Sequence, residues 1–127
     1  MANTEKPQFD IPADQTPPTD LVLEDLTMGD GQEAAAGHTI AAQYVGKSWS
    51  TGQQFDASWD RGAQPLEFPL GAGRVIQGWD QGIVGMKVGG RRKITIPPHL
   101  GYGAQGAPGA IAPNETLIFV VDLVGIR

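Results

Sequence analysis

In the middle of the chain, apolar residues recur with helical spacing, and two glycines lie between them. Ile76, Trp79 and Ile83 recur at intervals of three and four residues, which places them on one side of a short helix. Gly78 and Gly82 lie in the same stretch, and each lowers helix propensity by about 1 kcal/mol relative to alanine. We therefore predict a short helix that depends on tight packing, with glycines that let another group approach and Trp79 as the floor of a site.

The remaining pattern has the two-residue period of β-strands. It predicts an edge strand, a half-buried strand, three shorter strands and a last, nearly continuously apolar strand in the middle of a sheet, over 20–26, 38–49, 54–59, 66–70, 91–97 and 115–126. Pro69 indicates an edge or a strand end. An antiparallel sheet of five or six strands packed on one helix is the simplest architecture.

The first 19 residues differ from the rest in composition. They hold four of the ten prolines and little apolar content, which is typical of a mobile arm. Residues 1–36 carry eight acids and one lysine, whereas residues 37–127 carry six acids and eight bases. Because 127 residues suit one domain with its own core, we predict an acidic, proline-rich arm over 1–19 and a single domain over 20–127.

Composition excludes several classes of protein. No apolar run approaches 18 residues, so no membrane span is expected. The cluster Arg91-Arg92-Lys93 is too small for a nucleic-acid footprint and is interpreted as the solvated charges at a strand start. The chain has no cysteine for disulfides or a thiol nucleophile, and its N-terminus lacks the basic and apolar regions of a signal peptide. We expect a cytoplasmic monomer.

Conventional catalytic sets are nearly absent. His38 and His99 are the only histidines, and neither has the spacing of a metal ligand or of a catalytic triad. The glycine-rich stretches do not form a phosphate-binding loop, so no cofactor is expected. Aromatic and aliphatic residues remain, with one acid beside an aromatic in Phe55-Asp56, and they suggest a site that works by apolar shape.

Rotation about an Xaa-Pro amide is a reaction that suits such a site, because it breaks no covalent bond. Amide conjugation sets the barrier at roughly 18–20 kcal/mol. The planar amide has a charge-separated character that the twisted transition state has lost. An apolar pocket therefore disfavours the planar form more than the twisted one.

Several motifs in order identify a family. The run VIQGWDQGIVGMKVGGRRKITIP at 75–97 is followed by GYGAQG at 101–106, preceded by GQQFDASWDR at 52–61, and followed near the end by TLIFVVDLVGI. Over about residues 20–127 the chain resembles FKBP-type peptidyl-prolyl cis-trans isomerases. The resemblance implies an α+β fold in which a twisted antiparallel sheet of five to six strands half-wraps one short helix.

The resemblance also implies the residues of the site. Trp79 is expected under the proline ring, between aromatic walls. The backbone N–H of Ile76 and the hydroxyl of Tyr102 are expected to donate to substrate carbonyls. Asp56 is expected as a polar contact held by its neighbours. The implied catalytic residues are Tyr44, Phe55, Asp56, Ile76, Trp79, Tyr102 and Phe119, and the implied substrate- or inhibitor-binding residues are Val75, Ile111, Leu66 and Arg61.

The chain departs from the family pattern at the rim of the implied pocket. Leu66 stands where an aromatic is common, after an apparent one-residue insertion near Ala63, and Ala107 and Ala110 replace bulkier residues. The resemblance implies an isomerase that acts on proline-containing peptides and unfolded proteins and is inhibited by the macrolides tacrolimus and rapamycin. A proline-binding module without turnover and a holdase-type chaperone are the alternatives.

Overall fold

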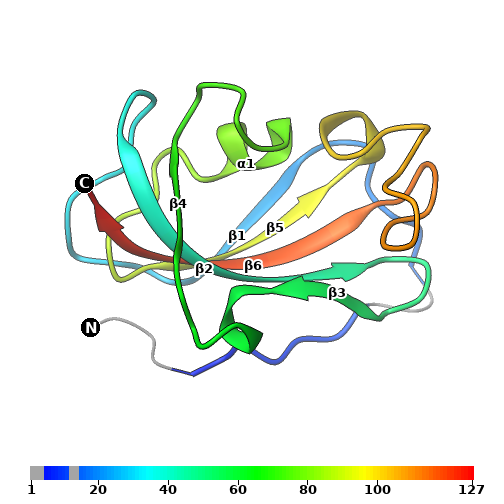
Figure 1. The fold of residues 1–127 in the computed structure, drawn as a ribbon, viewed down its shortest axis with the longest axis horizontal. Coiled ribbons are helices and arrows are strands. Elements are labelled where there is room, and N and C mark those ends of the chain that lie inside the picture. Colours follow the sequence, from blue (N-terminus) through cyan, green and yellow to red (C-terminus); the bar gives the residue numbers. More distant parts are fainter. Residues whose placement is uncertain (1–4, 12–14) are drawn as a thin grey trace.

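The computed structural model describes residues 5–11 and 15–127 and shows six antiparallel strands around one α-helix (Figure 1). The rest of the predicted arm, 1–4 and 12–14, lies outside the described residues. Two 3-10 helices, η1 and η2, complete the secondary structure of this part of the chain. The bounds are β1 Val22–Thr27, β2 Thr39–Ser48, β3 Gln54–Ala57, η1 Ser58–Asp60, β4 Leu66–Pro69, α1 Gln77–Gly82, β5 Arg91–Ile96, η2 Pro98–Leu100 and β6 Leu117–Ile126.

The strand order is β1-β5-β6-β2-β3, and β4 also pairs with β2. The apolar strand β6 therefore lies in the middle and β1 lies at an edge, which confirms both predictions. Strand β2 pairs with β4 along its first half and with β3 along its second half. Pro69 closes the short strand β4, opposite Thr39. That position is where a residue without an N–H is tolerated.

The register sorts alternate residues to two faces. On the inner face, which carries α1, Ile94 lies opposite Phe119 and Tyr44 opposite Val121, and all four belong to one apolar core. Thr95 lies between two core isoleucines and faces the other way, as predicted. The inner face thus forms an apolar wall along the helix, and Arg92, opposite Val121 on the same face, lies at the end of α1.

The prediction that β2 is half-buried is wrong, because the strand is buried on both faces. On the outer face, η1 and the loop after it fold over the strand. The hydroxyl of Ser58 donates to the side-chain carbonyl of Gln43 at 2.6 Å, and the amide of Gln43 donates to the backbone carbonyl of Ala63. A polar side chain on this strand is therefore satisfied by neighbours from distant sequence rather than by water.

The helix glycines are explained by close packing. A Cβ built on Gly78 would lie 2.6 Å from side-chain carbons of Ile96 on β5, and one on Gly82 would lie 3.1 Å from Ile94. Only a residue without a side chain lets the helix come this close to the sheet at Gly78. The predicted approach of another group is confirmed, and contact with β5 offsets the poor helix propensity.

The interpretation of the charges at the start of β5 as solvated is wrong for Arg91 and Arg92, which pair with Asp122 and Asp25. Arg92 is only 8% exposed. Its guanidinium donates to Asp25 on β1 at 2.7 Å and to the carbonyl of Gly82 at 2.7 Å. A cation at the last carbonyls of a helix is stabilising. Arg92 therefore joins β1, β5 and the end of α1.

Residues 5–11 of the arm contact the outer face. Pro7 is buried, Lys6 pairs with Asp60 at 2.9 Å, and the carbonyl of Phe9 accepts from Lys47 at 2.5 Å. The ammonium of Lys47 also lies 4.6 Å from the centroid of the Phe9 ring. The described arm residues thus lie against the sheet, and the division at residue 19 stays a prediction.

Candidate active site

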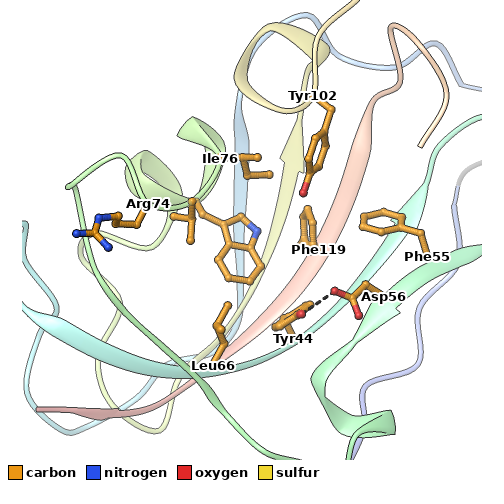
Figure 2. Close-up of a pocket in the computed structure, with 10 residues that line it drawn as sticks. Tyr44, Phe55, Asp56, Leu66, Arg74, Ile76, Tyr102 and Phe119 are labelled. Atoms are coloured by element: carbon orange, nitrogen blue, oxygen red, sulfur yellow. Dashed lines mark hydrogen bonds between the residues drawn. The ribbon is translucent and has the colours of Figure 1, made fainter. Parts of the chain in front are cut away.

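A cavity of about 200 Å³ opens between α1 and the inner face of the sheet. Figure 2 shows its walls, which come from β2, β3, β4, β6, the segment around α1 and the loop after η2. Pockets for drug-sized ligands hold about 300–1,000 Å³. One ring-sized group therefore fits inside and the rest of a ligand stays on the rim. The lining residues are Tyr44, Phe55, Asp56, Leu66, Arg74, Val75, Ile76, Trp79, Tyr102 and Phe119.

Trp79 forms a rigid floor. It is 4% exposed, and its ring lies edge-on to Tyr44 at 5.0 Å and to Phe119 at 5.2 Å between centroids. Phe68 supports it from another side at 5.6 Å. Edge-to-face pairs of this kind contribute about 0.5–1.5 kcal/mol each beyond burial. The floor is held by three aromatic neighbours before any ligand arrives.

Gly46 on β2 makes room for the aromatic walls. The rings of Phe55 and Phe119 meet edge-to-face with centroids 5.5 Å apart. A Cβ on Gly46 would lie 2.6 Å from both rings. Any side chain at this position would push the two walls into the cavity, so the glycine helps to set its width.

Asp56 is held by two hydrogen-bond donors. The Tyr44 hydroxyl donates to one carboxylate oxygen at 2.7 Å (Figure 2), and Arg61 donates to the other at 2.5 Å. Arg61 also donates to the Tyr44 hydroxyl at 2.6 Å. Burial by itself would raise the pKa of Asp56, but these hydrogen bonds outweigh it and hold the pKa below its usual value. Asp56 is a fixed anion and not a proton donor.

Three hydrogen-bond donors at the cavity have no partner among the described residues. They are the backbone N–H of Ile76, the hydroxyl of Tyr102 and the buried indole N–H of Trp79. Burial, followed by the negative charge of Asp56, raises the pKa of Tyr102, so its hydroxyl stays protonated and able to donate. Unpaired donors at a preformed apolar cavity fit a ligand that brings carbonyl oxygens.

The cavity brings together most of the residues that the sequence predicts. Ile111 is an exception: it is buried in the core, bridged to Ala107, and does not line the cavity. Arg61 also lies outside the lining and acts on it through Asp56 and Tyr44. The catalytic and binding roles given to these residues remain predictions.

Sequence reasoning missed Arg74, which lines the cavity directly before Val75. Its only signal in the sequence is its position directly before the motif at 75–97, of which only apolar residues were assigned to the cavity. Across the part of the chain that the structure describes, no cluster of His, Cys, Asp or Glu is placed to hold a metal ion. No helix there is long and apolar enough to cross a membrane.

Comparison with known proteins identifies the family of this chain. Residues 30–124 match the family described as FKBP-type peptidyl-prolyl cis-trans isomerase. This chain belongs to that family. Family members are generally peptidyl-prolyl isomerases, so the predicted family and general function are confirmed.

Two relatives match almost the whole chain. An FK506-binding protein of Streptomyces anulatus is 59% identical over 96% of this chain and 98% of its own length. A probable FK506-binding protein of Corynebacterium glutamicum is 48% identical over 94% of this chain and 98% of its own. The crystal structure of AtFKBP13 superposes with a TM-score of 0.79 at 39% identity, covering 94% of this chain and 99% of that one. The predicted fold class is confirmed.

Proposed function

We propose that this chain accelerates the cis–trans rotation of Xaa-Pro bonds, with the proline ring on Trp79. The observation that carries the proposal is a preformed aromatic cavity of about 200 Å³ in which Asp56, the only carboxylate among the described lining residues, is already paired. Such a site has no free acid or base at the ring position, and amide rotation needs none. Its substrates are proline-containing peptides and chains that are still folding.

Rate enhancement follows from differential binding. The cavity excludes water, which solvates the planar, charge-separated amide better than the twisted one. The free donors of Ile76 and Tyr102 stabilise the twisted carbonyl groups of the substrate. If these effects lower the barrier by about 5–7 kcal/mol, rotation is faster by about 10⁴–10⁵-fold. Uncatalysed rotation takes about 10–100 s at 25 °C and limits folding.

A peptide isomerisation assay, run with and without rapamycin, tests the proposal. We expect acceleration by the wild-type chain, inhibition by rapamycin, and a loss of about tenfold or more in kcat/KM for Tyr102→Phe, since that variant lacks one donor. Trp49→Phe changes an aromatic on the outer face and is the control. An unchanged rotation rate with the pure wild-type protein would refute catalysis.

Macrolide binding is a finer part of the proposal. The FK506-binding names of the relatives support it, and the cavity volume leaves most of a macrolide on the rim. Ala107 and Ala110 offer little contact area there, and Leu66 is 39% exposed. We therefore propose inhibition that is weaker than in relatives with bulkier rims. The cytoplasmic location and the monomeric state are likewise proposals.

A further inference from the structure

Among the described residues that line the cavity, Arg74 is the one cation. It is exposed and lies in the loop between β4 and α1. Its side chain makes no hydrogen bond or ion pair with any other described residue. Figure 2 places it at the end of the cavity opposite Asp56 and Phe55, with the guanidinium directed away from those two residues. It therefore faces the part of a bound peptide that leaves the cavity.

The loop that carries Arg74 is fixed from the helix. Asp80 on α1 accepts from the backbone N–H of Gly71 at 2.8 Å and from that of Gly73 at 3.0 Å. Both glycines have positive φ, 81° and 73°, a conformation that other residues rarely adopt. The backbone at Arg74 is thus set by the same helix that supplies the floor, and only the side chain remains free to meet a ligand.

The lining has an unbalanced charge. Asp56, the only carboxylate among its described residues, is neutralised by Arg61, which lies outside the lining. Arg74 has no such counterpart. A peptide with a carboxylate near its proline gains a charge-assisted, two-pronged contact with the guanidinium, and a peptide with a lysine there meets repulsion.

We propose that Arg74 determines specificity by favouring substrates with a glutamate or aspartate within two residues of the proline. The proposal rests on the proposed function, since it concerns the peptide bound in that cavity. Because Arg74 is exposed, the preference is modest, about two- to fivefold. It acts on binding at the rim and so appears mainly in KM.

The test compares peptide pairs that differ only by glutamate against glutamine, at each of the two positions before and after the proline. We expect the wild-type chain to favour glutamate by about two- to fivefold in kcat/KM at one or more positions. The preference shrinks at high salt through screening. It disappears in Arg74→Gln and inverts in Arg74→Glu. Reading the ratio within each variant cancels any general loss of activity.

Lys87→Gln is the matched control, because it removes one exposed positive charge elsewhere and should keep the wild-type ratio. Equal kcat/KM for every pair, or a glutamate preference that survives in Arg74→Gln, would overturn the proposal. If no peptide is turned over, the proposed catalysis has failed separately. The same pairs are then compared by Kd from tryptophan fluorescence, where an equal Kd for glutamate and glutamine peptides would overturn the role of Arg74.

Discussion

The two faces of the sheet are built from the same strands but differ in what their side chains contact. On β6, Phe119 faces inward and contacts Trp79, whereas Asp122, three positions later, faces outward and is paired with Arg91 at 2.7 Å. The inner face is aromatic and leaves hydrogen-bond donors free beside a cavity. The outer face binds its charges to one another and to the arm, since Arg91 also donates to the backbone carbonyl of Glu5.

The difference separates ligand binding from stability. Free donors and unfilled volume reduce the stability of the inner face and prepare it for a carbonyl-bearing ligand. On the outer face, by contrast, the buried carboxylate of Asp122 is paired with Arg91. A buried carboxylate requires such a partner. Substitutions on the inner face should therefore alter activity and stability together, and substitutions on the outer face should alter stability alone.

The largest effect should come from the floor. Trp79→Ala removes a buried ring with three aromatic neighbours, so we expect a loss of about 3–5 kcal/mol in the free energy of unfolding and loss of isomerase activity. Urea unfolding followed by circular dichroism measures the first, and the peptide assay the second. Trp49→Ala on the outer face, where the side chain is half-buried, should cost about 1 kcal/mol and leave activity intact. Equal losses would contradict the division of the two faces.

Gly78→Ala tests the close approach of helix and sheet. The added methyl group meets Ile96, so we expect a loss of about 1–3 kcal/mol in spite of the better helix propensity of alanine. Gln77→Ala, one position earlier on the exposed side of α1, is the control and should be neutral or stabilising. If Gly78→Ala were the more stable of the two variants, packing against β5 would not explain the glycine.

Deletion of residues 1–19 tests the outer face. It removes the Lys6–Asp60 pair and the contact of Phe9 with Lys47, so we expect a loss of about 1–2 kcal/mol in unfolding free energy. Activity on a short peptide should persist below the unfolding temperature, because these contacts lie away from the cavity. Lys6→Ala alone should cost less than the deletion. Lost activity in a folded deletion variant would show that the arm supports the site.

The smallest expected effect is that of pH. The pKa of Asp56 lies below the usual 3.8, so its charge stabilises the folded state above that value, and the contribution is lost as pH falls through the lower folded pKa. Burial, followed by the hydrogen bond to Asp56, raises the pKa of Tyr44, which stays neutral at moderate pH. We expect kcat/KM to be flat from about pH 5 to 9. A bell-shaped profile near neutrality would indicate acid–base catalysis instead.

Most of the inner face could be predicted from the sequence. The helical spacing of Ile76 and Trp79 and the apolar run of β6 are local patterns, and they place the floor and the central strand correctly. Arg74 could not be found this way, because a single charge in a loop has no periodicity. Its position depends on two backbone hydrogen bonds to Asp80.

The partners of the charged residues and the second buried face of β2 were decided by tertiary structure. An arginine at a strand start is usually solvated, and only the meeting of β1, β5 and the end of α1 pairs Arg92 with Asp25 and a helix carbonyl. Likewise β2 is buried on its second face because η1, from later in the sequence, folds over it. Periodicity reports one local environment for each residue, whereas burial on a second face depends on segments that are distant in the chain. The sequence by itself thus determined the strands, the helix and the aromatic set of the cavity, and the tertiary structure decided which charges became partners.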